Sequence, residues 1–100
     1  MIVHSRVGDQ GELIISIEGN FDFNEYRSFT DEYQGFNQVF KKYVIDLSET
    51  KSVDNSALGM LLLLRDFAGG DASEVCLINP NPAVRELLDE SNFNKFFNII

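Results

Sequence analysis

The segment Val53–Arg65, with the sequence VDNSALGMLLLLR, most constrains the fold because polar capping residues run directly into a long apolar stretch. Asp54 and Asn55 are favoured N-cap residues, so a helix is predicted to begin here and to continue to about Ala68. Ser56 then lies in the first turn, where unpaired backbone N–H groups and the positive end of the helix dipole favour an anionic group. From the local pattern alone, Ser56 is either part of an ordinary N-terminal cap or the seat of a phosphate.

This predicted helix is apolar on nearly every side, so a sheet beneath it covers only part of its apolar surface. At 100° per residue, one apolar stripe consists of Ala57, Met60, Leu61, Leu64 and Ala68. Leu58, Leu62 and Leu63 fall largely on the opposite side. For Leu58 and Leu62 two alternatives stay open: neighbouring helices cover them, or they form an exposed patch that binds a partner. Gly69–Asp71 is expected to end the helix.

Two strands are predicted near the N-terminus, over residues 2–7 and 12–18, and Gly8–Gly11 has the composition of a turn between them. The second strand alternates apolar and other residues, which predicts one well-buried face. Its buried side chains are expected to be Leu13, Ile15 and Ile17. Gly19–Asn20 is then expected to turn the chain.

A first helix is predicted after this turn, because Asp22 and Glu25 have the spacing of a capping box. Aromatic residues then recur every three or four positions, which favours one buried stripe over a ligand platform. These residues are Tyr26, Phe29, Tyr33, Phe36 and Phe40. Gly35 is expected to mark fraying or the end of the helix.

The run Tyr43–Leu47 predicts a central strand with a parallel neighbour, because it is apolar on both faces apart from Asp46. Asp46 either contributes to a site at the C-terminal end of the sheet or bonds backbone N–H groups of the following loop. Asp22 and Asp54 are expected to approach the same end of the sheet.

A further strand is predicted at Val75–Ile78, and it contains the single cysteine, Cys76, for which we expect a buried thiol without a disulfide partner. Asn81 and Pro82 have the pattern of an N-cap followed by the first residue of a last helix. The apolar face of that helix consists of Val84, Leu87 and Leu88. The tail at residues 93–100 is expected to pack back as a short strand or turn. Its last apolar residues either seal the core or dock on a partner, and they are Phe97, Ile99 and Ile100.

These elements predict a single α/β domain over residues 1–100, in the order β-β-α-β-α-β-α. The expected architecture is a mixed sheet of four to five strands with helices packed mainly on one side and right-handed crossovers between parallel strands. A chain of 100 residues with 44% hydrophobic side chains, including nine phenylalanines, suffices for one such core.

The net charge of −8 argues against binding to nucleic acid or to an anionic membrane, because only eight lysine and arginine residues are present. No stretch reaches the ~18 apolar residues of a membrane span, and the first residues lack the pattern of a signal peptide. We therefore expect a cytoplasmic location.

The chain offers little that would activate a nucleophile, so we do not expect an enzyme. The single histidine, His4, lies in the first predicted strand, and there is neither a phosphate-binding glycine loop nor a zinc-type cluster. Asp22, Asp46 and Asp54 could in principle hold Mg²⁺, but carboxylates beside a phosphate acceptor more simply shape the loop and its recognition. No metal or other cofactor is expected.

The runs Tyr43–Ser48 and Val53–Gly59 resemble the strand, loop and helix start of STAS domains, specifically those of the bacterial anti-sigma-factor antagonists. In that family the loop reads Asp-Ser-Ser-Gly-Leu-Gly or a close variant, and its second serine, which a partner kinase phosphorylates, matches Ser56. Gly19–Asp22 and Asn79–Leu88 also resemble family segments. The resemblance therefore covers nearly the whole chain.

Two residues of this loop depart from the family pattern. Asn55 stands in place of the first serine, which removes a possible secondary phosphate acceptor, and Ala57 replaces the usual glycine, which adds a methyl group beside Ser56. Neither change forbids phosphorylation, but both alter the surface that a partner meets.

The resemblance implies a regulatory switch in which the unphosphorylated domain binds an anti-sigma factor or related serine kinase. Phosphorylation of Ser56 would release this partner, and a PP2C-type serine phosphatase would reset the switch. The implied partner-binding residues are Asp22, Asp54, Asn55, Ser56, Ala57, Leu58, Gly59 and Leu62. The alternative is a constitutive STAS scaffold, such as a small accessory subunit of a lipid or anion transport system, in which Ser56 is only a cap. The oligomeric state is left open between a monomer and a weak dimer.

Overall fold

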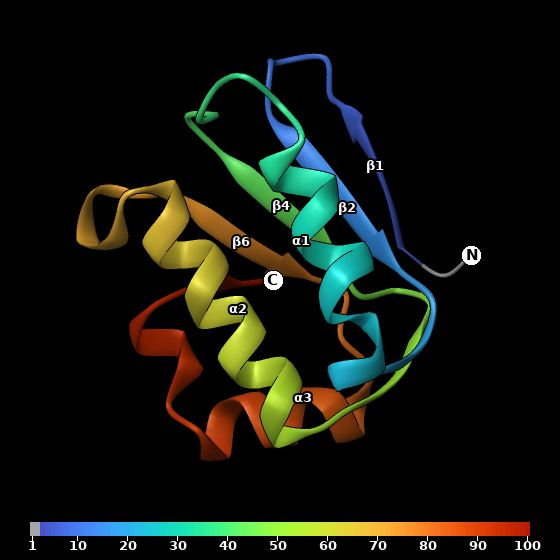
Figure 1. Ribbon diagram of the computed structural model, residues 1–100. Helices are drawn as coiled ribbons and strands as arrows, with labels where there is room; N and C mark the ends of the chain where they lie inside the picture. Colours follow the sequence, from blue (N-terminus) through green and yellow to red (C-terminus); the bar gives the residue numbers. More distant parts are fainter. Residues whose placement is uncertain (1–2) are drawn as a thin grey trace.

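The computed structural model describes residues 3–100 and contains a five-stranded mixed sheet (Figure 1). In spatial order the strands are β1 (Val3–Val7), β2 (Leu13–Ile17), β4 (Tyr43–Asp46), β6 (Val75–Ile78) and β7 (Asn98–Ile99). β1 runs antiparallel to β2, and the other neighbouring strands are parallel. The predicted mixed sheet is therefore confirmed, and the C-terminal tail supplies its fifth strand. Ile2, from the first predicted strand, lies outside the described residues.

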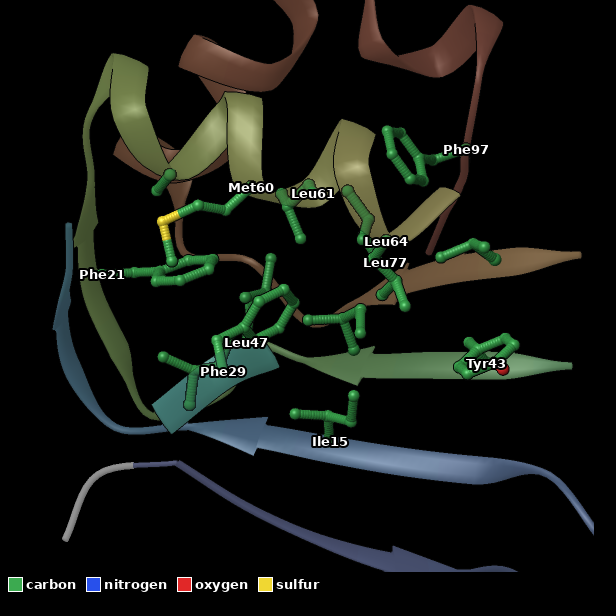
Figure 2. Close-up of a cluster of buried hydrophobic side chains, with 14 of the residues drawn as sticks. Ile15, Phe21, Phe29, Tyr43, Leu47, Met60, Leu61, Leu64, Leu77 and Phe97 are labelled. Atoms are coloured by element: carbon green, nitrogen blue, oxygen red, sulfur yellow. The ribbon is translucent and has the colours of Figure 1, made fainter. Parts of the chain in front are cut away.

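Three α-helices lie on one side of this sheet, as predicted (Figures 1 and 2). They are α1 (Tyr26–Gln34), α2 (Asn55–Ala68) and α3 (Pro82–Glu90). Short 3₁₀ turns flank them: η1 (Phe23–Glu25), η2 (Gly70–Ala72) and η3 (Phe93–Lys95). Within residues 3–100, no helix has both the length and the apolar character that a membrane crossing requires.

The core lies between the sheet and α2 (Figure 2). The side chains that β2 directs into it are fully buried, as the alternating pattern predicted, and they are Leu13, Ile15 and Ile17. The predicted apolar stripe of α2 is also confirmed: Ala57, Met60, Leu61 and Leu64 are buried and Ala68 is half-buried. α2 ends as predicted at Gly69, whose φ of 125° is favourable only for glycine.

A second, two-stranded sheet was not predicted. β3 (Gly19–Phe21) pairs in parallel with β5 (Thr50–Val53), so the expected turn at Gly19–Asn20 is wrong. Gly19, with a φ of 85°, redirects the chain in one residue, and the following residues then form ladder bonds instead of a loop. The buried Thr50 hydroxyl anchors the ladder by donating a hydrogen bond to the Ile17 carbonyl over 2.7 Å.

The first helix begins later than predicted, whereas its end at Gly35 is as predicted. The Asp22 carboxylate accepts a hydrogen bond from the Asn24 N–H at 2.9 Å, which stabilises the 3₁₀ turn η1, and the α-helix begins only at Tyr26. The helix ends at Gly35, so the single five-membered aromatic stripe is wrong. Two of its members are buried in α1 (Phe29 and Tyr33), one is exposed at its start (Tyr26), and two pack from the following loop (Phe36 and Phe40).

The C-terminal third follows the prediction closely. The Asn81 carboxamide oxygen caps α3 by accepting a hydrogen bond from the Val84 N–H at 2.8 Å, and Pro82 is the first helical residue. Val84 and Leu88 are buried, and Leu87 packs against the core. In the tail, Phe97 is buried and Ile99 is half-buried against the core, so these two residues help to seal the core. Ile100 is exposed. Cys76 is a buried free thiol.

The Asn81 side chain should stabilise the domain in two ways. Its oxygen caps α3, and its amide group donates to the carbonyls of Thr50 and Lys51 at 3.1 and 3.2 Å. We expect Asn81→Ala to lower the free energy of unfolding by about 2 kcal/mol, through loss of the cap and of these bonds. Asn81→Ser keeps a capping oxygen and should lose only about half as much. Urea unfolding followed by circular dichroism measures both. No loss in Asn81→Ser would show that the link to β5 contributes nothing, and equal losses in the two variants would show that the cap contributes nothing.

Candidate functional site

The candidate site begins at the N-cap of α2. The Asp54 backbone is extended, with φ −107° and ψ −179°, and its carboxylate oxygen Oδ1 accepts a hydrogen bond from the Ala57 N–H at 2.9 Å. The Asp54 carbonyl accepts from the Leu58 N–H at 3.1 Å, which starts the helical ladder. These two bonds fix the first turn of α2 and place Ser56 within it, as the sequence predicted.

The Ser56 hydroxyl donates a hydrogen bond to the same Asp54 oxygen, Oδ1, over 2.7 Å. Ser56 is half-buried and Asp54 is exposed. The Ser56 hydroxyl, and after it the Ala57 N–H, hold the pKa of Asp54 below its ordinary value, because hydrogen bonds to the charged form of a carboxyl group favour that form. At neutral pH, an ionised carboxylate therefore orients the hydroxyl of Ser56.

Asp22 lies beside this cap because of the β3–β5 ladder. Phe21 and Val53 are partners in its register, and the Asp54 N–H donates to the Phe21 carbonyl at 3.3 Å. Asp22 directly follows Phe21 at the end of β3, and Asp54 directly follows Val53 at the end of β5. The backbones of Asp22 and Asp54 are therefore neighbours at the end of this ladder, and each carboxylate caps the turn that follows it.

Asp46 has a different role. Its carboxylate accepts a hydrogen bond from the Ser48 N–H at 3.0 Å, which is the loop-bonding alternative. Across residues 3–100, no three histidine, cysteine, aspartate or glutamate side chains gather closely enough to hold a metal ion.

The structure corrects part of the predicted partner surface. Ala57 is completely buried and Leu58 exposes only 7% of its surface, so neither side chain is available to a partner in the folded domain. Leu58 belongs to the core cluster that also contains Val84 and Leu88 of α3. Of the two alternatives for Leu58, internal burial is the one observed.

The accessible surface beside Ser56 consists instead of Asn55, Gly59, Leu62 and Leu63, all on the outer side of α2. Leu62 and Leu63 expose 37% and 49% of their surface. The sequence reasoning placed Leu63 on the side of the helix opposite the buried stripe, in agreement with its exposure, but the implied partner set did not include it. Phe23, which is 65% exposed, was missed, and its place directly after Asp22 could have revealed it.

Comparison with known proteins identifies the family of this fold. Residues 5–100 match the family model described as "Mlab, STAS domain". A STAS-domain containing protein of Pseudomonas aeruginosa (strain UCBPP-PA14) is 46% identical over 91 residues, which are 91% of this chain and 90% of that protein. The chain therefore belongs to the STAS family.

Solved structures share the fold at low sequence identity. The anti-sigma factor antagonist SpoIIAA in its unphosphorylated form matches with a TM-score of 0.81 and 16% identity over 98% of this chain and 87% of that chain. The phosphorylated form of the Bacillus SpoIIAA matches with a TM-score of 0.69 and 16% identity over 98% and 90%. A sulfate transporter family protein from Wolinella succinogenes matches with a TM-score of 0.75 and 13% identity over 93% and 80%. This architecture thus serves in both regulatory and transport-related proteins.

Leu58 and Leu62 form a matched pair for testing which leucine is core. We expect Leu58→Ala to lower the free energy of unfolding by about 2–5 kcal/mol, the usual cost of truncating a buried leucine. Leu62→Ala removes the same atoms from a partly exposed position and should cost about 1 kcal/mol or less. Chemical denaturation of the two variants measures the difference. A larger loss in Leu62→Ala than in Leu58→Ala would contradict the burial described above.

Proposed function

We propose that this protein is a phosphorylation-switched binding protein of the anti-sigma-factor antagonist type, with Ser56 as the phosphate acceptor. The observation that carries this proposal is the Ser56 hydroxyl at the N-terminus of α2, half-buried and oriented by the ionised Asp54 over 2.7 Å. The position also matches the serine that is phosphorylated in the family that the loop sequence resembles. The likeness to SpoIIAA, which has been solved in both forms, supports the same reading.

In this proposal the unphosphorylated domain binds an anti-sigma factor or related serine kinase, and a PP2C-type phosphatase restores the binding state. The contact surface consists of Asp22, Asp54, Asn55, Ser56, Gly59 and Leu62, the exposed or half-buried members of the implied set. Phosphorylation adds about −1.5 to −2 charge at neutral pH. A partner surface that fits a neutral hydroxyl beside the Asp54 carboxylate would then have to accommodate a second anionic group at that point. The domain acts by binding, without catalysis, and we place it in the cytoplasm.

Gly59 supports a close contact on this surface. A glycine inside a helix costs about 0.5–1 kcal/mol relative to alanine. A Cβ atom added at Gly59 would meet nothing within 4 Å, so nothing inside the domain requires a glycine there. A partner that packs closely against the helix backbone at this point would explain why this residue has no side chain.

The second candidate function is a constitutive accessory domain of an anion or lipid transport system. The likeness to a sulfate transporter family protein favours it. In that case Ser56 would act only as part of the helix cap, and its modification would be unnecessary.

The proposal predicts that phosphate is found on Ser56 and on no other nearby serine. Tagged protein recovered from its native host should carry phosphate at Ser56, detected by mass spectrometry of its peptides. Ser56→Ala should abolish this signal, whereas Ser52→Ala should retain it. Ser52 is a matched control because its exposed hydroxyl, bonded to Asn20 at 2.8 Å, lies four residues away.

Binding to the kinase should follow the charge at residue 56. Ser56→Ala should bind the kinase but should not be released by ATP, and Ser56→Asp should bind more weakly with an unchanged circular-dichroism spectrum. Equal affinity for the phosphorylated and unphosphorylated forms would reject the switch and favour the accessory-domain function.

Gly59→Ala should separate stability from binding. We expect the variant to gain about 0.5–1 kcal/mol in unfolding free energy, because alanine is the better helix former and the added methyl group meets open space. The same variant should bind the kinase at least several-fold more weakly in a calorimetric titration. A variant that is more stable and binds equally well would remove Gly59 from the contact surface.

A further inference from the structure

We propose that phosphorylation of Ser56 makes the new phosphate replace the Asp54 carboxylate as the N-cap of α2, so that Asp54 turns outward. This inference rests on the proposed function, because it assumes that Ser56 receives the phosphate. It adds a consequence for the surface of the domain: phosphorylation would change two anionic groups at once, one newly attached and one displaced.

The present arrangement cannot survive the modification. A single oxygen, Asp54 Oδ1, accepts both the Ser56 hydroxyl at 2.7 Å and the Ala57 N–H at 2.9 Å. Phosphorylation replaces the hydroxyl hydrogen by phosphorus, so the Ser56 Oγ no longer donates. Two oxygen atoms without a hydrogen between them do not remain at hydrogen-bond distance, and the phosphate places its negative charge beside the ionised carboxylate.

The phosphoryl group that is transferred to Ser56 comes from a nucleoside triphosphate, which is the co-reactant of this step. The Ser56 Oγ–H bond is exchanged for an Oγ–P bond, and the bond from the terminal phosphorus to the nucleoside diphosphate breaks. The hydroxyl proton passes to a base of the kinase, and the nucleoside diphosphate leaves.

The phosphate is the better ligand for the first turn of α2. It carries more charge than a carboxylate and three strong acceptor oxygens, and it is attached one residue before Ala57, whose N–H the carboxylate now holds. Backbone N–H groups and the helix dipole favour the group with the larger negative charge. The exchange therefore lets the helix keep a cap while the two anions separate.

Only the side chain of Asp54 has to move. Its backbone stays anchored through the N–H to the Phe21 carbonyl at 3.3 Å and through its carbonyl to the Leu58 N–H at 3.1 Å. Its carboxylate is exposed, so rotation toward solvent meets open space. The displaced carboxylate then adds to the surface next to Asp22, where a partner would meet it.

The test uses the whole chain with phosphoserine inserted at residue 56 during translation, so it needs no kinase. Nuclear magnetic resonance should show a ¹⁵N–³¹P scalar coupling across a hydrogen bond from the Ala57 amide, and the Ala57 amide shift should follow the phosphate titration near pH 6. In the same sample the pKa of Asp54 should rise from its lowered value, because its two hydrogen bonds are lost and an anion lies nearby. Phosphoserine at residue 52 is the matched control and should leave Ala57 and Asp54 unchanged.

The proposal is overturned if the Ala57 amide shows neither the coupling nor the phosphate titration, whatever the pKa of Asp54 does. Loss of amide dispersion in the sample phosphorylated at residue 56 would overturn it as well, since the exchange requires a folded domain. A failure to find phosphate on Ser56 in cells would instead contradict the proposed function and would leave this result unaffected.

Discussion

The packing of the apolar stripe of α2 on the parallel centre of the sheet determines both the fold and the direction in which the candidate site faces. Met60, Leu61 and Leu64 are almost completely buried against the strands (Figure 2). With these positions fixed, the 100° rotation per residue turns Gly59 and Leu62 outward and leaves Ser56 at the border between core and surface. The accessibility of Ser56 is thus a consequence of how the helix buries its leucines.

The small β3–β5 sheet adds the second constraint on the site. Its parallel register pairs Phe21 with Val53, and both strands end at this pair. The next residue on each strand, Asp22 or Asp54, caps a helical turn. Asp22 and Asp54 are therefore brought close by backbone pairing and not by any attraction between them. Two acidic residues on neighbouring backbone segments, in a domain with a net charge of −8, make the site sensitive to added negative charge.

The sequence predicted the parts of the structure that depend on regular spacing or on contacts between near neighbours. The alternation in β2 extends over five residues and the apolar stripe of α2 belongs to a helix of fourteen residues, so both show a clear period. The Asp54 cap beside Ser56 needs no period, because it depends on the residue types at the start of the helix. β3 could not be predicted, because its three residues are too few to show a period and because Gly19 and Asn20 are residue types that are common in turns. The choice between Leu58 and Leu62 likewise depended on where α3 packs, which no local pattern encodes.

The magnitudes decide how a modification at Ser56 can act. A helix cap contributes about 1 kcal/mol, whereas each buried leucine of α2 contributes about 2–5 kcal/mol when compared with alanine. Rearranging the cap therefore changes the stability of α2 by much less than its core contacts supply, and the helix stays in place. Any signal that originates at Ser56 must then be read from the charge and shape of the surface around it, because the energy available there is too small to unfold the domain. This argument favours a partner that contacts the first turn of α2 directly over one that senses a rearranged fold from a distance.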